Sequence, residues 1–200
     1  MRKILTRSFY SRSPIIVAKE LIGKSLVRIL ENGQKLEGII VETEAYGGSR
    51  DPASHAYRGI TPRNEVMFGE AGHAYVYFTY GFHNCLNFVT GKKGIATAVL
   101  IRAIEPTKGI EIMSKFRETA IPKQIASGPG KLCQALAIDR SLNGTDITKN
   151  NSPIYVLNQC KQMWVKSSPR IGISEGRERK WRFFAEGNEN VSRRTSYLHL

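Results

Sequence analysis

The sequence predicts an α+β fold, a single domain in which helices flank a curved, mainly antiparallel sheet shaped as an open, barrel-like roll. Short β-rich runs mostly follow one another across tight turns, which is typical of strands that pair antiparallel. Helical patterns stand between groups of such runs instead of alternating with single strands. The 200 residues contain no repeat, low-complexity segment or linker, and 41% of them are hydrophobic, so we expect residues 1–200 to form one domain.

The first elements are a helix and a β-hairpin. A Ser13-Pro14 pair precedes an apolar run that Gly23 ends, which is the usual order of N-cap, first turn and C-terminal glycine in a helix. An Asn32-Gly33 dipeptide, which favours a tight hairpin turn, lies between two β-rich runs, 25–30 and 35–46.

The remaining elements follow in groups. Residues 47–72 hold five Gly, two Pro and three Arg but no apolar period, and a structureless stretch of that length is usually functional or disordered. Turns are expected at Tyr80-Gly81 and at 91–94. Beyond the long loop we expect three strands, two helices and three further strands, at 73–80, 85–90 and 95–104, then 109–118 and 129–138, then 153–157, 170–173 and 181–185.

The chain is strongly basic. It has 30 Lys and Arg against 17 Asp and Glu, a formal net charge of +13, and the excess is spread over both halves of the sequence. Such a field attracts polyanions, of which nucleic acid is the commonest inside cells. The alternative is a charge that serves only solubility.

Several classes of protein are disfavoured. No apolar run is long enough for a membrane span, and the residues after Met1 turn polar before a signal-peptide core could form. The three cysteines, Cys85, Cys133 and Cys160, form no CxxC pair, which argues against a disulfide framework and against a cysteine-rich zinc module. We therefore expect a soluble cytoplasmic protein with no membrane partner.

One candidate site lies at the end of the second predicted strand. Because alternate residues of a strand share a face, Glu42, Glu44 and Tyr46 project together. A carboxylate near the rim of the sheet can be desolvated enough to act as a general base; the alternative is a pair of surface glutamates bridging to Arg and Lys. Arg102 interrupts an apolar strand and needs a partner there, either a carboxylate such as Glu44 or a bound phosphate.

Aromatic side chains crowd the strand predicted at 73–80. Tyr75 and Tyr77 share one face, and Tyr80 falls at the turn, where a bulky ring must point outward. In a basic protein such tyrosines suit stacking on bases or wedging into a duplex. Aromatic residues also simply build sheets, so that interpretation stays open.

Three weaker candidates also stay open. His73, His83 and Cys85 could suggest a metal site, but no second ligand pair follows, and we expect no metal. Residues 127–131, Ser-Gly-Pro-Gly-Lys, could hold a phosphate at a helix start or merely cap the helix. The basic run 177–182 is either a solvated strand edge or a contact for a nucleic-acid backbone.

Together these segments resemble the alkyladenine (3-methyladenine) DNA glycosylase family, in its compact bacterial form. The likeness is collinear over nearly the whole chain. It is carried by Ala18-Lys-Glu-Leu-Ile-Gly-Lys24, Val41-Glu-Thr-Glu-Ala-Tyr46, Asp51-Pro-Ala-Ser-His55, Thr61-Pro-Arg-Asn64, Met67-Phe68, Tyr75-Val-Tyr77, Tyr80-Gly81, Cys85-Leu-Asn87, Leu100-Ile-Arg-Ala103, Glu105-Pro106, Ser127-Gly-Pro-Gly-Lys-Leu-Cys-Gln-Ala135 and Trp181-Arg-Phe183.

The resemblance implies roles for individual residues. Glu44 would be the general base that deprotonates the water attacking C1′ of the damaged nucleotide, and Arg102 the arginine beside that water and the target phosphate. Asn87 would clash with the 2-amino group of guanine. The rest of the pocket for the extruded purine would be formed by Tyr46, His55 and Tyr77 and by the backbone of Ala53. Duplex DNA would be contacted by Tyr80, as a wedge filling the gap left by the base, and by Phe82, Thr61 and Arg63.

The implied activity is that of a monofunctional DNA glycosylase that needs no cofactor. Its substrate would be double-stranded DNA containing 3-methyladenine, 7-methylguanine, hypoxanthine or ethenoadenine, and without a lysine Schiff base it would not cut the strand. Neutral bases need a proton to leave, for which His55 is one candidate. We expect a monomer associated with the bacterial nucleoid.

Two other classes of function compete with this one. A non-catalytic DNA- or RNA-binding module would use the basic face and the aromatic rings alone and would tolerate loss of the Glu44 carboxylate. An enzyme acting on free nucleosides would explain neither the net charge of +13 nor an outward-pointing Tyr80.

Overall fold

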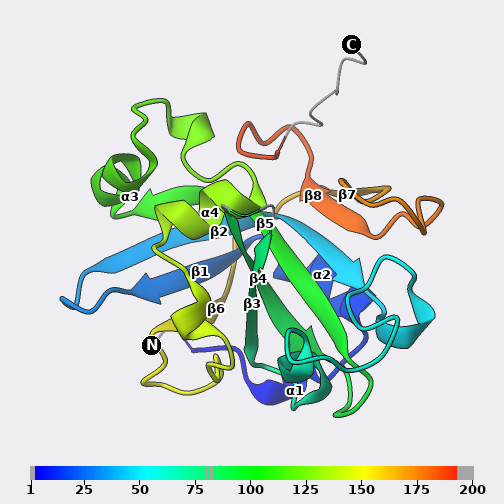
Figure 1. Cartoon of the computed structure of the whole chain (residues 1–200). Coiled ribbons are helices and arrows are strands. Elements are labelled where there is room, and N and C mark those ends of the chain that lie inside the picture. Colours follow the sequence, from blue (N-terminus) through cyan, green and yellow to red (C-terminus); the bar gives the residue numbers. More distant parts are fainter. Residues whose placement is uncertain (1–2, 80, 82, 193–200) are drawn as a thin grey trace.

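The computed structural model describes residues 3–79, 81 and 83–192, and within them eight strands form one sheet in which every pairing is antiparallel. The order is β3-β4-β5-β2-β1-β6, with β8 beside β2 and β7 beside β8 (Figure 1). The strand bounds are β1 (Lys24–Ile29), β2 (Lys35–Tyr46), β3 (Ala74–Thr79), β4 (His83–Thr90), β5 (Thr97–Lys108), β6 (Ile154–Cys160), β7 (Val165–Ser168) and β8 (Arg182–Ala185).

The helices are short and flank this open sheet, which confirms the predicted α+β class. Helix α2 packs on the central strands, where its Ala18 carbonyl accepts a hydrogen bond from the Thr43 hydroxyl at 2.8 Å. The helix bounds are α1 (Arg7–Tyr10), α2 (Pro14–Leu21), α3 (Ile110–Arg117) and α4 (Pro129–Ala135), with 3-10 turns η1 (Gly48–Arg50), η2 (Glu65–Phe68), η3 (Pro122–Gln124) and η4 (Arg140–Leu142).

The predicted N-terminal elements are confirmed. Helix α2 starts at Pro14 after the N-cap Ser13 and is followed by Gly23 in the left-handed conformation, φ +87°. Strands β1 and β2 pair as the expected hairpin around Asn32-Gly33. Within the described residues, no helix is both long and apolar enough to cross a membrane.

Two predictions about the late strands were wrong. Residues 170–173, expected as a strand, form none, because the Arg170 side chain is buried in an ion pair and Gly172 turns the backbone at φ +75°. Strand β7 was not expected, since Lys166, Ser167 and Ser168 give it no apolar alternation. It pairs with β8 alone and is half exposed.

The long loop at 47–72 has a defined course built on one buried amide. The Asn64 side chain donates to the carbonyls of His55 and Gly59 at 2.8 and 3.0 Å and accepts from the Thr61 N–H at 2.7 Å. A buried amide that satisfies backbone groups in this way substitutes for the ladder of a regular element. The loop is therefore ordered, and its turn η2 packs on β3, β4 and β5; of the two alternatives that its length left open, functional or disordered, the structure excludes disorder.

The sheet changes partner and register at the point where its charged residues sit. One edge of β2 pairs with β5 along its length, while the other edge pairs first with β1 at 35–39 and then with β8 at 42–44. In the pairing with β5, Ile40 faces Ile104, Glu42 faces Ala103 and Thr43 faces Ile101, so that Val41 and Arg102 are bulged. Bulges redirect side chains and occur often beside active sites.

Candidate active site

One row of side chains crosses four strands, and three of its four members line a cavity. Glu44 on β2 faces Leu100 on β5, which faces Asn87 on β4, which faces Tyr75 on β3. Residues that face one another across a sheet point to the same side. On that side a cavity of about 310 Å³ is lined by Tyr46, Ala53, Ser54, His55, Met67, Tyr75, Tyr77, Thr79, Cys85, Asn87, Ala98, Leu100, Arg102, Pro129, Ile171, Gly172 and Ile173.

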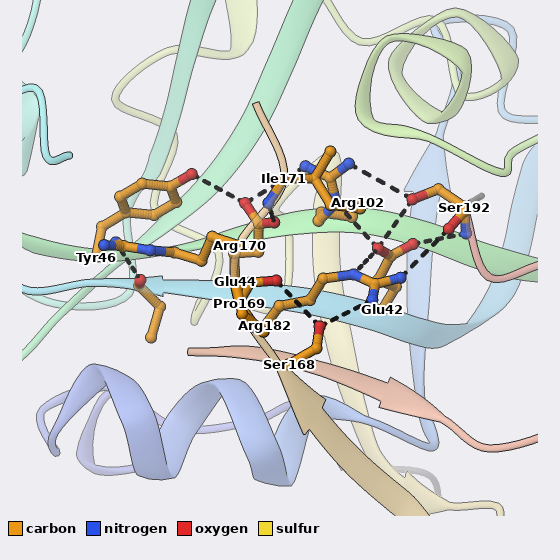
Figure 2. Close-up of polar contacts among 11 residues, drawn as sticks. Glu42, Glu44, Tyr46, Arg102, Ser168, Pro169, Arg170, Ile171, Arg182 and Ser192 are labelled. Atoms are coloured by element: carbon orange, nitrogen blue, oxygen red, sulfur yellow. Dashed lines mark hydrogen bonds and ion pairs between the residues drawn. The ribbon is translucent and has the colours of Figure 1, made fainter. Parts of the chain in front are cut away.

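Glu44 lies behind this lining and is completely buried. Its Oε2 accepts a hydrogen bond from the Tyr46 hydroxyl at 2.9 Å and lies 3.4 Å from Nη1 of Arg102, while its Oε1 accepts from the Ile171 N–H at 2.7 Å (Figure 2). These contacts use three of the roughly four acceptor positions of the carboxylate, and the Glu44 side chain has no solvent exposure. The structure confirms that Glu44 and Tyr46 lie on one face and that Arg102 is a partner of Glu44. The alternative interpretation, in which the glutamates lie at the protein surface, was wrong.

Glu42, the second buried carboxylate, fixes Arg102 from the other side. Its Oε1 accepts from Nε of Arg102 at 3.0 Å and from Nε of Arg182 at 2.6 Å, and its Oε2 accepts from the Ser192 N–H at 2.7 Å (Figure 2). Burial opposes the charge of Arg102, but the nearby Glu44 and Glu42 carboxylates outweigh it and raise the pKa of Arg102. Arg102 is therefore a fixed cation between two carboxylates at the wall of the cavity.

The opposite side of the cavity is aromatic. The rings of Tyr75 and Tyr77 lie with centroids 5.3 Å apart, and the His55 ring meets Tyr77 edge-on at 4.5 Å. Burial raises the pKa of Tyr75 to about 12, and burial together with the Glu44 charge raises the pKa of Tyr46 well above its usual value. The hydroxyl groups therefore remain protonated, and the rings present neutral, polar-tipped faces to a ligand.

His55 is tied to the same cluster, with its Nδ1 3.0 Å from the Tyr75 hydroxyl. Burial, and then the charge of Arg63, lower the pKa of His55 to about 4. The imidazole is therefore neutral near pH 7, which argues against the earlier interpretation of His55 as the acid that protonates neutral bases.

The other residues expected from the sequence lie around the cavity. Asn87 is buried and its amide donates to the Tyr75 carbonyl at 3.2 Å, and the Ala53 N–H donates to Asp51 at 3.3 Å. Arg63 is exposed, with its guanidinium 5.1 Å from the centre of the Tyr77 ring, and Thr61 is exposed in the same turn. Tyr80 and Phe82 lie outside the described residues, so their predicted DNA contacts stay predictions.

A second hollow of about 740 Å³ adjoins the first at Arg102, Pro129 and Ile171. It is lined by residues 127–131, which lead into α4, and by the cationic side chains of Lys123 and Lys131. The basic hollow therefore extends the cavity beside Arg102.

Within the described residues, no three His, Cys, Asp or Glu side chains are grouped as a metal site would need.

Sequence reasoning missed three contributors to the site. Tyr75 was predicted on the same strand face as Tyr77 but was not included among the site residues. Its alternation with Tyr77 was the signal that could have identified it as part of the pocket. Arg170 and Ile171 were assigned to a strand, although Ile171 contacts Glu44 through its backbone N–H. A backbone donor leaves no signature in the sequence.

Comparison with known proteins identifies the family to which the chain belongs. The sequence profile of the family described as Methylpurine-DNA glycosylase (MPG) matches residues 8–189. A protein of Carboxydothermus hydrogenoformans, provisionally named a 3-methyladenine DNA glycosylase, is 50% identical over 193 residues, which cover 96% of this chain and all of the relative. Relatives with the same name from Methanocella arvoryzae and Desulfitobacterium hafniense are 49% and 45% identical, over 96% and 95% of this chain and 96% and 98% of their own lengths. The chain belongs to the methylpurine-DNA glycosylase family and is a DNA N-glycosylase.

Proposed function

We propose that the protein extrudes an alkylated purine from duplex DNA into the 310 Å³ cavity and hydrolyses its N-glycosidic bond, as the first step of base excision repair. The observation that carries the proposal is the Glu44 carboxylate, which is held by Tyr46, Arg102 and Ile171 directly behind an aromatic cavity. A base inside a duplex cannot be reached by such a buried group, so extrusion is required.

The tyrosine cluster supports recognition of cationic purines. Alkylation at N3 or N7 puts a positive charge on the base, and aromatic faces attract cations. Tyr46, Tyr75 and Tyr77 all line the cavity, and the rings of Tyr46 and Tyr77 already have the guanidinium groups of Arg170 and Arg63 over them. We therefore propose 3-methyladenine and 7-methylguanine as the substrates that the site accepts most readily.

The chemistry follows from the two charges beside the cavity. The bond between C1′ and the base nitrogen breaks with its electron pair going to the base, and the sugar acquires oxocarbenium character. Glu44 stabilises this cation and takes a proton from the attacking water, whose oxygen bonds to C1′. Arg102, fixed between Glu42 and Glu44, faces the hollow where the neighbouring phosphate would lie. Among the described residues, those that line the 310 Å³ cavity include no lysine, whereas Lys123 and Lys131 line the adjoining hollow; we propose hydrolysis without strand cleavage.

Neutral lesions pose a different demand. Hypoxanthine and ethenoadenine leave readily only when protonated, and the tyrosine hydroxyls and the neutral His55 around the cavity do not supply a proton easily near pH 7. We propose that they are also removed, but more slowly than cationic purines, with the proton coming from solvent.

A duplex carrying one 7-methylguanine, incubated with excess enzyme at neutral pH, tests the proposal when the released free base is quantified by chromatography. Wild-type protein should release the base, and Glu44→Gln should lower the single-turnover rate by about 10²- to 10⁴-fold, the usual contribution of a general base. The variant should keep its affinity for undamaged duplex. A folded Glu44→Gln protein that excises at the wild-type rate would instead favour a different role for this cavity.

A further inference from the structure

A single buried guanidinium joins three segments around the cavity. Nη1 and Nη2 of Arg170 donate to the two carboxylate oxygens of Asp51 at 2.5 and 2.8 Å, and Nη1 also donates to the Ala45 carbonyl at 3.0 Å. Both charged side chains have no solvent exposure. The guanidinium carbon lies 4.7 Å from the centre of the Tyr46 ring, and Figure 2 shows the two side chains lying along one another.

The residue after this guanidinium contacts the candidate general base. The Ile171 N–H donates to Oε1 of Glu44 at 2.7 Å, and Ile171, Gly172 and Ile173 line the cavity. Within the described residues, no hydrogen bond between backbone groups anchors 170–173. Side chains hold this segment instead: Arg170 through Asp51, and Arg177, whose Nε donates to the Ile173 carbonyl at 3.0 Å. Of the two, Arg170 is adjacent to the Ile171 N–H.

The acidic partner organises the other wall. Asp51 accepts the N–H groups of Gly47 and Ala53 at 3.0 and 3.3 Å, and Ala53 lines the cavity. Burial alone would raise the pKa of Asp51, but the hydrogen bonds from Arg170 and these amides hold it below its usual value. One ion pair thus links the base pocket at Ala53 to the segment that touches Glu44.

We propose that Arg170, paired with Asp51, is a positioning residue that holds the Ile171 N–H against Glu44 and so fixes the orientation of the carboxylate toward its water. The inference rests on the proposed function. Buried ion pairs add little net stability compared with apolar residues of the same shape, because desolvation offsets their attraction. What a bidentate Arg–carboxylate pair provides is geometry, which a lysine cannot reproduce.

Arg170→Lys tests the inference, because lysine keeps the positive charge but cannot form the bidentate hydrogen bonds to Asp51. The single-turnover rate of excision should fall by about 10- to 100-fold, as small misplacements of catalytic groups do, while affinity for a duplex with an abasic-site analogue stays unchanged. Arg7→Lys is the matched control: Arg7 pairs with Asp146 at 2.7 Å, does not line the cavity, and should leave excision unaffected.

A double mutant separates positioning from simple structural support. If Arg170 acts through Glu44, Arg170→Lys should cause little further loss in the Glu44→Gln background, because the effects of coupled residues are not additive. Full additivity, or a loss of affinity for the abasic analogue equal to the loss of rate, would overturn the inference.

The two proposals fail in different ways. A Glu44→Gln protein with wild-type activity would remove the proposed function, whereas an inactive Glu44→Gln beside a fully active Arg170→Lys would remove only the positioning role. Folding of each variant is checked by its urea midpoint. If Arg170→Lys does not fold, Asp51→Asn replaces it as the test, because it keeps the shape of the side chain and loses its charge. We expect Asp51→Asn to lower the rate of excision while leaving affinity for the abasic-site analogue unchanged.

Discussion

The two walls of the cavity are built in different ways. Glu42, Glu44 and Arg102 stand on the paired central strands β2 and β5, where two bulges turn them toward one another. The other wall comes from the loops 47–72 and 169–181, whose course is set by buried side-chain contacts such as Asp51 with Arg170. The reacting groups thus lie on paired strands. The base pocket is shared: Tyr46, Tyr77 and Asn87 come from strands, whereas Ala53 and His55 come from the 47–72 loop.

The difference between strand-borne and loop-borne contacts indicates which part of the site contributes most to stability and which part contributes to recognition. A strand-borne charge is held by the ladder on both sides, so removing its partner leaves a buried charge that cannot move to water. A loop-borne contact can relax locally when it is lost, because loops open at lower free energy than core strands. We therefore expect removal of a shared charge partner in the strand wall to cost the most stability. Changes in the 47–72 loop should impair recognition of the base, and Arg170 is the member of the loop wall expected to act on the rate.

The largest effect on stability is expected at Glu42. Glu42→Ala leaves Arg102, Arg182 and the Ser192 N–H without their shared acceptor. Breaking a buried pair from one side costs about 3–5 kcal/mol, and urea unfolding at pH 7 measures it. Lys166→Ala, which removes an exposed partner of Glu186, is the control and should change little. If Glu42→Ala lowers the free energy of unfolding by less than about 1 kcal/mol, the buried pair contributes no more than an exposed one. The two walls would then not differ in stability.

In the loop wall the largest effect should come from Asn64. Asn64→Ala removes three hydrogen bonds that hold His55, Gly59 and Thr61, and we expect a loss of about 1–3 kcal/mol. Excision should show a raised KM, because His55 is no longer held at the rings, with a smaller change in kcat. Asn32→Ala in the exposed hairpin turn serves as control. A lowered kcat with an unchanged KM would contradict the assignment of this loop to recognition.

The difference between the strand wall and the loop wall also determines which site residues could be predicted from the sequence. The strand wall follows from period-two alternation and from the need of Arg102 for a partner, so Glu44, Tyr46 and Arg102 could be placed together in advance. The loop wall has no period: Asp51 and Arg170 pair across 119 residues, and Ile171 acts through its backbone. His55 and Ala53 could be named only through resemblance to a family. Strand β7 escaped prediction because an edge strand needs no apolar face.

A weaker effect is expected from pH at His55. Its pKa is about 4 in the folded protein, against an ordinary value of 6.5, so between these values the unfolded chain binds more protons. The stability that His55 contributes is fully present above pH 6.5 and is lost as pH falls toward 4. Because His55 is exposed, solvent screening makes the effect smaller than the shift alone suggests. Urea midpoints from pH 7 to 4.5 should fall less steeply for His55→Gln than for the wild type, and parallel curves would contradict this account.

The smallest effect should come from Arg63, the exposed cation at the edge of the loop wall. Its guanidinium lies over Tyr77 and its Nη2 donates to the Phe78 carbonyl at 3.2 Å, which leaves further donors for a phosphate. Arg63→Gln should lower the slope of log affinity against log salt by about one, because each phosphate contact releases about one counterion. Lys149→Gln, at an exposed position that lines neither hollow, should leave the slope nearly unchanged. Since the Arg63 charge also helps to lower the pKa of His55, the same variant should flatten the pH dependence of stability. A variant that changes the pH response but not the salt slope would assign Arg63 to the pocket and not to DNA.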